Sequence, residues 1–337
     1  MIISRTPLRM SFVGGGSDLP SFYRQHGGAV LSTAINKYIY ISANRKFDGG
    51  IRVAYSKTEE VDHRDAIEHQ LVRTTMEMLG IVGGVEITST ADIPSQGTGL
   101  GSSSAFTVGL LNVLSAYQGR HISAEDLGRL SCEVEIDRCG EPIGKQDQYA
   151  SAFGGLSLIE FNPDDSVNVT PMIMPPETRA ALQQKIIVFY TGVARSASGI
   201  LREQSASVAD DKVKQEMLKR MVALTYELMK ELKAGRLDSM GDALEENWRL
   251  KKALAAGISN TVIDEWYAKA KAAGALGGKL MGAGAGGFLM FYAPADRHDA
   301  IAKAVGLRRV DIGFEPLGSR IVFYNPTSFD NPSSFSL

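Results

Sequence analysis

Cysteine is nearly absent from the sequence, and an excess of charge of one sign is missing altogether. The 337 residues include two cysteines, Cys132 and Cys139, which are too few for a disulfide framework or a zinc module. Lysine and arginine total 36 and aspartate and glutamate total 38, so the net charge is 36 − 38 = −2. A chain this close to neutrality has no global field to attract nucleic acid or an anionic membrane.

Long apolar runs are also missing. Residues 288–293 form one of the longest, far short of the roughly 18 residues that cross a bilayer. The first nine residues, MIISRTPLR, carry charge where a signal peptide needs its apolar core. The sequence therefore predicts a cytoplasmic protein with neither a membrane nor a nucleic acid as partner.

The apolar pattern predicts an α+β protein, strand-rich first and helix-rich later. At roughly 150 residues per domain the length suggests two domains, with the seam in the four-proline segment 162–176. The expected units are 1–165 and 177–324, followed by an irregular tail at 325–337. Short runs rich in Ile, Val, Tyr and Phe predict strands at 1–3, 8–13, 29–31, 39–43, 51–55, 85–89, 155–161, 185–190, 287–292 and 321–324. The pattern predicts helices at 63–79, 106–117, 199–233, 237–255 and 261–273, and a capping pair, Ser123 with Asp126, opens another that ends near 140.

Glycine is the abundant residue that discriminates between classes of protein. Many of the 35 glycines gather in three clusters, at 14–16, 97–101 and 277–287. Glycine lets a backbone approach a ligand closely and adopt positive φ. Three such clusters predict a site assembled from distant segments of the chain.

The middle cluster has the parts of a phosphate site. Gly97, Gly99 and Gly101 can turn successive N–H groups inward, and three serines then enter the first turn of a helix. The simpler interpretation is a flexible connection with a serine N-cap. No Walker A loop, H-R-D or D-F-G motif occurs, so any ATP binding uses a different kinase fold.

The third cluster contains a G-x-G-x-x-G match at Gly282, Gly284 and Gly287. A dinucleotide-binding loop needs a strand before this motif and a helix after it. Here the apolar run FLMFY follows, which is typical of a strand. The context therefore disfavours a Rossmann site.

Three separated motifs resemble those of the GHMP kinases, which include galactokinase, homoserine kinase and mevalonate kinase. They are TPLRMSFVGGGSD at 6–18, PSQGTGLGSSSA at 94–105 and KLMGAGAGG at 279–287. The variant GGGSDLP and the runs at 144–155 and 251–260 are similar to the branch that phosphorylates a heptose 7-phosphate. The resemblance implies the GHMP kinase fold, two lobes with the active site between them, and an N-terminal lobe that binds ATP.

The same resemblance implies an activity. It is the Mg²⁺- and ATP-dependent phosphorylation of the anomeric hydroxyl of D-glycero-D-manno-heptose 7-phosphate, for nucleotide-activated heptose and cell-surface glycan synthesis. The partners would be ATP or ADP and a phosphorylated sugar, and a homodimer is left open. Two alternatives stay open: another GHMP kinase, of the fucokinase or galactokinase type or acting on an isoprenoid alcohol, and a catalytically silent sugar or nucleotide sensor.

The resemblance also implies residue roles at the nucleotide end. Asp147 matches the catalytic base and Arg9 the basic residue near the transferred phosphate. Ser103 and Glu135 match the Mg²⁺ ligands, and the third serine of the loop leaves Ser102 or Ser104 able to share that role. The expected ATP-phosphate-binding set is Gly97, Gly99, Leu100, Gly101, Ser102, Ser103 and Ser104.

At the sugar end, Asp18 matches the aspartate that holds sugar hydroxyls. Gly15 stands where galactokinases have a glutamate, which argues against galactose. Arg195, Lys145 and Lys251 are the candidate cations that would bind the phosphate of the substrate. Each of them could equally be a solvated surface charge. The expected substrate-binding set is Gly15, Gly16, Ser17, Asp18, Lys145, Arg195, Lys251 and Gly284.

Overall fold

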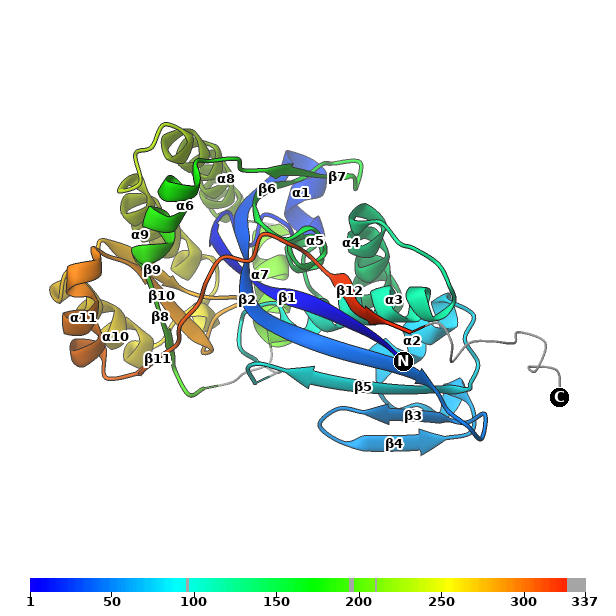
Figure 1. Ribbon diagram of the computed structural model, residues 1–337. Coiled ribbons are helices and arrows are strands. Elements are labelled where there is room, and N and C mark those ends of the chain that lie inside the picture. Colours follow the sequence, from blue (N-terminus) through cyan, green and yellow to red (C-terminus); the bar gives the residue numbers. More distant parts are fainter. Residues whose placement is uncertain (95–96, 194–196, 210, 326–337) are drawn as a thin grey trace.

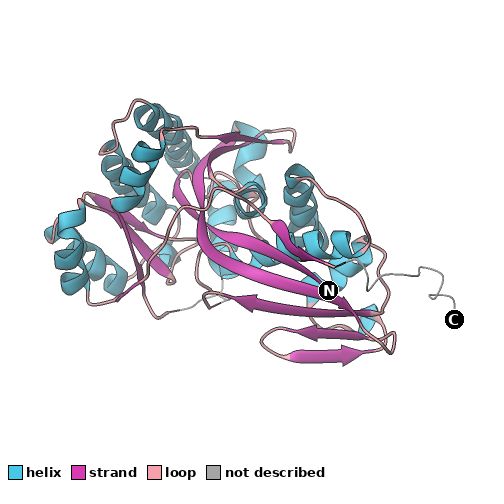
Figure 2. Cartoon of the chain, in the orientation of Figure 1, coloured by secondary structure: helices cyan, strands magenta, loops and turns pink. Residues whose placement is uncertain are grey.

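The computed structural model describes residues 1–94, 97–193, 197–209 and 211–325. Over these residues the chain forms two β-sheets with helices packed on both (Figures 1 and 2). The expected tail at 325–337 lies almost wholly outside the described residues. None of the described helices is both long and apolar enough to cross a membrane.

The larger sheet has eight strands in the described part of the chain. Its order is β12-β1-β2-β5-β3-β4, and β6 pairs with β2 and β7. All its pairings are antiparallel except that of β3 with β5. The strands are β1 (Ile2–Val13), β2 (Gly28–Arg45), β3 (Ile51–Ala54), β4 (Thr58–Val61), β5 (Val85–Ala91), β6 (Leu156–Phe161), β7 (Val167–Pro171) and β12 (Arg320–Tyr324).

The first two strands are longer than the sequence pattern predicts. β1 runs without a break through the polar segment that separates the apolar runs at 1–3 and 8–13. Pro7 has no N–H to give to the ladder, and the pairing with β2 shifts its register between Pro7 and Leu8. This irregularity lets one strand continue past a residue that would otherwise interrupt it.

The smaller sheet holds four strands in the order β11-β8-β10-β9. The strands are β8 (Ile186–Tyr190), β9 (Gly277–Leu280), β10 (Phe288–Tyr292) and β11 (Arg308–Arg309). Helices surround it at one end of the molecule (Figure 1). They are α6 (Pro176–Gln184), α8 (Lys212–Lys233), α9 (Ser239–Leu254), α10 (Thr261–Ala272) and α11 (His298–Val305).

Of the remaining helices, several pack beside the larger sheet, whereas α7 (Ala197–Ala209) contacts α8 and α9. α3 packs on β1 and β2, and α4 and α5 pack against each other beside it. The helices are α1 (Pro20–His26), α2 (Gln70–Met78), α3 (Ser102–Tyr117), α4 (Ala124–Cys132), α5 (Gln146–Phe153) and α7 (Ala197–Ala209), with a π-helix, η2 (Glu133–Arg138), and 3₁₀ turns η1 (Arg64–Ala66), η3 (Ala256–Ile258) and η4 (Ala295–Arg297).

One hydrophobic core joins the two sheets. A single cluster of buried residues includes Leu8 and Leu31 from the larger sheet, Leu224 from α8, and Phe288 and Met290 from the smaller sheet. β12 also pairs with β1, so the last described strand returns to the larger sheet instead of ending in the helix-rich part. The lobe division at 165 and 177 stays a prediction.

Two predicted helices are wrong in extent. The helix expected at 199–233 is two helices, and α8 begins anew at Asp211, whose side chain accepts from the N–H groups of Val213 and Lys214. That N-cap satisfies donors that a new helix leaves unpaired. The helix expected at 63–79 begins only at Gln70, after a 3₁₀ turn.

Candidate active site

A cavity of about 550 Å³ opens where the three glycine-rich segments meet. Its wall comes from β1 and the loop after it, the start of α3, the loop before α5, and parts of α7, α9 and β9. The lining residues are Arg9, Ser11, Gly15, Gly16, Asp18, Leu19, Gly97, Thr98, Gly99, Gly101, Ser102, Ser103, Ser104, Glu141, Ile143, Gly144, Gln146, Asp147, Ser198, Leu201, Lys251, Lys279, Gly282 and Ala283.

Glycine is required where two of these loops touch. Gly99 has φ +75°, and a Cβ there would lie 2.4 Å from the carbonyl oxygen of Met281. Gly282 has φ +74°, and its Cβ would lie 2.4 Å from the Cα of Gly99. No side chain fits at either position. The second and third motifs therefore interlock through bare backbone.

An ion pair forms the centre of the wall. The Arg9 guanidinium donates from Nε to Asp147 Oδ1 at 2.6 Å and from Nη2 to Asp147 Oδ2 at 2.7 Å. Its Nη1 donates to the carbonyl of Gly99 at 2.7 Å, and the Arg9 backbone N–H donates to the carbonyl of Leu100 at 3.0 Å. Arg9 is 3% exposed. A bidentate pair of this kind fixes the carboxylate in one orientation.

The serines of the loop meet a buried carboxylate. Ser103 Oγ donates to Glu135 Oε1 at 3.0 Å, and Gln148 Nε2 donates to Oε2 at 2.6 Å. Burial raises the Glu135 pKa to about 7; hydrogen bonds from Ser104, Gln148 and Ser103 oppose that rise, and the charge of Asp147 adds to it. Glu135 is therefore a carboxylate without a counter-charge of its own.

Of the three acidic residues of the π-helix, Glu135 is the one that faces inward. Glu133, two residues earlier, pairs with Arg138 on a partly exposed face, and Asp137 is exposed. Only Glu135 of the three is buried. Such π-helical segments are short and frequent at functional sites.

Asp18 lies in the loop after β1 and is 2% exposed. Its Oδ1 accepts from the Gly16 N–H at 2.9 Å, and its Oδ2 accepts from Gln146 Nε2 at 3.0 Å. Burial first, and then the nearby charge of Asp147, raises the pKa of Asp18. The loop thus holds a carboxylate at the cavity wall with its two oxygens on different donors.

Two lysines complete the wall on this side. Lys251, from α9, donates to the carbonyl of Gly15 at 3.2 Å and to Gln204 Oε1 at 2.9 Å. Lys279, from β9, donates to the carbonyl of Ser11 at 2.9 Å. Burial lowers the pKa of Lys251 to about 8. Burial also lowers the pKa of Lys279, to about 7, and the positive charges of Lys251 and Arg9 add to this effect.

Other predicted substrate residues lie elsewhere. Lys145 does not line the cavity in the described structure; it donates to Asp165 Oδ1 at 3.1 Å and lies 4.9 Å from the ring centre of Tyr23. Ser17 is fully buried and exchanges hydrogen bonds with the backbone of Ala29, so it shapes the loop.

Gly284 is also away from the wall. It has φ +130° and packs against the backbone of Ile258, where a Cβ would lie 2.6 Å from Ile258 Cα. The predicted Arg195 lies outside the described residues. Ser198, three residues further along the chain, lines the cavity and donates to Glu141 Oε2 at 3.0 Å.

Sequence reasoning did not find three of the polar residues around the cavity. Gln146 and Gln148 flank Asp147 and hold Asp18 and Glu135, and Lys279 begins the third motif. The signal was present for all three, because each stands inside a quoted motif. Their side-chain directions depend on the start of α5 and on the pairing of β9, which the sequence pattern does not specify.

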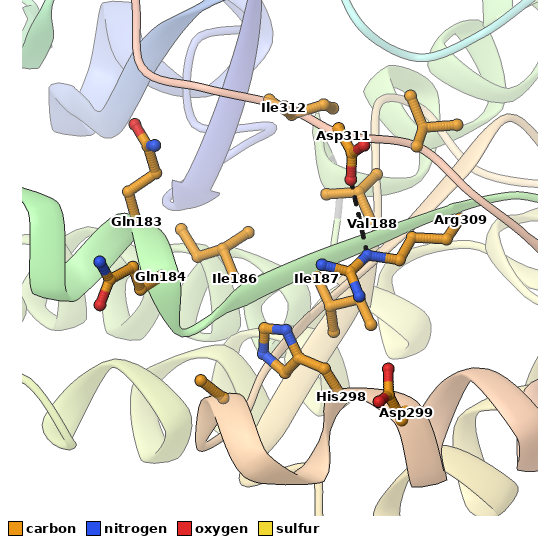
Figure 3. A pocket seen from close by; sticks show the side chains of 12 residues that line it. Gln183, Gln184, Ile186, Ile187, Val188, His298, Asp299, Arg309, Asp311 and Ile312 are labelled. Atoms are coloured by element: carbon orange, nitrogen blue, oxygen red, sulfur yellow. Dashed lines mark ion pairs between the residues drawn. The ribbon is translucent and has the colours of Figure 1, made fainter.

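A second cavity, of about 360 Å³, borders β8 and α11, and no residue lines both cavities. Figure 3 shows its Arg309 paired with Asp311, at 3.6 Å, and His298 beside β8. Its other lining residues are Gln183, Gln184, Ile186, Ile187, Val188, Ala295, Asp299, Val310 and Ile312. None of the sequence motifs contributes to it.

Comparison with known proteins identifies the class. Residues 67–155 match the GHMP kinases N terminal domain and residues 228–309 the GHMP kinases C terminal domain. The mevalonate kinase of Thermococcus onnurineus is 31% identical over 74% of this chain and 71% of its own length. The chain belongs to the GHMP kinase family and is an ATP-dependent kinase.

Two further similar proteins are a curated relative and a solved structure. The D-glycero-alpha-D-manno-heptose 7-phosphate kinase of Campylobacter jejuni is 27% identical over 90% of this chain and 93% of its own length. A crystal structure named a D-glycero-D-manno-heptose 1-phosphate kinase, from Bacteroides thetaiotaomicron, superposes with a TM-score of 0.79. It covers 96% of this chain and all of its own, at 24% identity, and so supports the fold.

Proposed function

We propose that this kinase transfers the γ-phosphoryl group of ATP to the anomeric (C1) hydroxyl of D-glycero-D-manno-heptose 7-phosphate, giving the 1,7-bisphosphate. The observation that carries the proposal is the Asp147 carboxylate. Nε and Nη2 of Arg9 hold it between the start of α3, which carries the serines, and the Asp18 loop. The choice of acceptor rests on the Campylobacter relative and on Gly15, which leaves no carboxylate at that position for a hexose.

At the nucleotide end, the first turn of α3 supplies N–H groups that have no partner within the helix. With Ser102, Ser103 and Ser104 beside them, these donors suit phosphate oxygens. The described residues include no cluster of three or more His, Cys, Asp or Glu side chains suited to a metal. One carboxylate and one hydroxyl are what Mg²⁺ uses when phosphates and waters complete its shell.

Glu135 and Ser103 therefore fit Mg²⁺ as hard oxygen ligands. Among the described residues Glu135 has no cation within 4.0 Å, and its hydrogen-bond partners Ser103 and Gln148 are neutral. When bound, Mg²⁺ neutralises charge on the phosphate oxygens. The chain's own contribution is to hold Glu135 in place through Gln148 and Ser103.

At the acceptor end, Asp147 accepts the proton of the attacking hydroxyl. Arg9 occupies one hydrogen-bonding position on each carboxylate oxygen, and the remaining lone pairs are available to the sugar. Arg9 also ties this carboxylate to Gly99 of the phosphate loop. Because phosphoryl transfer depends mainly on alignment and charge neutralisation, this link between base and loop matters as much as basicity.

A coupled assay for ADP formation tests the proposal. With ATP and Mg²⁺, we expect turnover with heptose 7-phosphate and little with the unphosphorylated heptose, galactose, fucose or mevalonate. The product should show an anomeric phosphate by ³¹P NMR, and a chelator should abolish the rate. Good turnover with an unphosphorylated sugar would replace the acceptor, and binding without turnover of any acceptor would favour the sensor. A cytoplasmic location, a homodimer and a place in cell-surface glycan synthesis belong to the same proposal.

A further inference from the structure

Lys251 and Lys279 bring two ammonium groups to the cavity wall with almost no exposure to solvent. Lys251 is 6% exposed and Lys279 is 4% exposed, and both line the cavity. They come from different elements, α9 and β9. An ammonium taken out of water loses several kcal/mol of solvation unless other groups replace it.

The hydrogen-bond acceptors that replace water here are neutral, and the buried Asp18 acts on both lysines only through its charge, without an ion pair. Lys251 donates to a carbonyl and to the amide oxygen of Gln204, and Lys279 donates to the carbonyl and, at 3.5 Å, the hydroxyl of Ser11. Within the described residues neither lysine has a carboxylate within 4.0 Å, whereas the nearby Arg9 is paired with Asp147. Each ammonium has three donors, so at least one remains for a ligand.

A third donor lies beside them. Gln204 is fully buried, and among the described residues its Nε2 has no hydrogen-bond partner. A Cβ on Gly16, which lines the cavity, would lie 2.4 Å from this Nε2 and 3.1 Å from Lys251 Nζ. A side chain at Gly16 would therefore collide with both nitrogens, and the bare backbone leaves room for them beside the cavity wall.

The position of these donors separates them from the phosphate loop. Arg9 and Ser11 both line the cavity from β1, and two residues of strand span about 7 Å. Along β1 and the loop after it, Arg9 comes first and holds Asp147. Ser11, which accepts from Lys279, follows in β1, and Gly15, which accepts from Lys251, follows in the loop. Neither lysine donates to a described residue of the loop 97–104, whereas Arg9 donates to Gly99 of that loop.

We propose that Lys251 and Lys279 together bind the phosphate ester that the acceptor sugar already carries, and so make the enzyme select phosphorylated sugars. This rests on the proposed function and deepens it. The reacting hydroxyl lies at Asp147, and the distant phosphate lies between the two ammonium groups. Of the predicted cations, Lys145 is paired with Asp165 and Arg195 lies outside the described residues, so this site uses Lys251 and a lysine that sequence reasoning did not assign.

The test compares binding by Lys251→Met, Lys279→Met and a matched control, Lys252→Met. Lys252 is the next residue of α9, does not line the cavity, and pairs with Asp264 at 2.9 Å. Calorimetric titrations with ADP and Mg²⁺ present use four probes: heptose 7-phosphate, mannose 6-phosphate and the two unphosphorylated sugars. Removing one partner of a buried charge pair weakens binding by at least about 30-fold.

We expect each cavity variant to lose at least about 30-fold in affinity for the sugar phosphates, with the unphosphorylated sugars and ADP bound as in the wild type. The control should match the wild type with every probe. An equal loss of affinity for phosphorylated and unphosphorylated sugars would overturn the proposal. A loss of ADP affinity would also overturn it, because it would place the lysines at the nucleotide phosphates.

A second readout separates binding from a structural role. Methionine removes a buried charge and keeps most of the volume, so the melting temperatures of the variants should equal or exceed that of the wild type. Lower melting temperatures together with unchanged sugar-phosphate affinity would show that the lysines only support the fold.

The two proposals fail in different ways. If heptose 7-phosphate is not turned over but mannose 6-phosphate binds in a lysine-dependent manner, the acceptor is wrong and the phosphate site stands. If heptose 7-phosphate is turned over and Lys279→Met keeps the full preference for it, the function stands and the phosphate site is wrong.

Discussion

The two cavities described above differ in how far their charged side chains are buried. The larger one is lined by Arg9, Asp18, Lys251 and Lys279, each at most 6% exposed. The smaller one has an arginine and an aspartate too, but the side chain of Arg309 is 44% exposed and that of Asp311 is 95% exposed. Both are hollows of a few hundred Å³, so volume does not distinguish them.

Burial of charge does distinguish them. Taking an ion out of water costs several kcal/mol, and a stable fold is more easily built without it. Around the larger cavity this cost is only partly offset, because Glu135 and the two lysines have neutral partners. In the smaller cavity the one buried titratable side chain, His298, lies 3.3 Å from the carbonyl of Ala293. Retained, uncompensated charge indicates a site that awaits charged ligands.

The largest expected effect comes from Asp147→Asn. Amide replaces carboxylate at nearly the same volume, so the hydroxyl of the acceptor loses its proton acceptor, and kcat should fall by at least about 100-fold. Single-turnover measurement with saturating ATP and acceptor checks this. The matched change in the smaller cavity, Asp311→Asn, should leave kcat unchanged. A rate within a few-fold of the wild type would limit Asp147 to positioning the substrate.

The same contrast explains what the sequence could predict. The cavity with buried charge is built from the three motifs, and the family resemblance singled out Glu135, the acidic residue that meets Ser103. The family resemblance, now confirmed, supplied the fold. The smaller cavity carried no motif, and none was predicted there.

Other features were beyond sequence reasoning because they depend on direction. Lys145 is two residues from Asp147, yet it turns to Asp165, while Lys279, in a strand of glycines, is buried beside Ser11. A lysine in a sequence is equally compatible with solvent and with a cavity. The break at Asp211 was missed because the apolar stripes of α7 and α8 are nearly continuous.

A smaller effect concerns stability against pH. The folded-state pKa values of Lys279 and Lys251, about 7 and about 8, lie below the ordinary value of 10.5. Above about pH 7 the unfolded chain therefore holds protons that the folded chain has released, so these lysines make the free energy of unfolding rise with pH. The charges of Lys251 and Arg9 lower the pKa of Lys279 further, and the charge of Asp18 acts against them.

Urea denaturation between about pH 7 and pH 9.5 measures this slope. Over that range the wild type should gain about 1 to 3 kcal/mol more than Lys279→Met does. Above this range the raised pKa values of buried tyrosines such as Tyr23 and Tyr267 act in the opposite direction. Equal slopes in the two proteins would mean that Lys279 stays protonated when folded and has a counter-charge after all.

The smallest effect is expected in the smaller cavity, from Arg309→Met. Its guanidinium is half exposed and 3.6 Å from an almost fully exposed carboxylate, and such pairs contribute between about 0 and 1 kcal/mol. The free energy of unfolding should change by less than about 0.5 kcal/mol, with kcat and KM for both substrates as in the wild type. Urea denaturation and the coupled assay check both points. If Arg309→Met instead altered turnover or acceptor preference, an exposed arginine that is paired with a neighbouring aspartate would prove functional. Burial of charge without an ion-pair partner would then no longer distinguish the catalytic cavity from a cavity that binds no substrate.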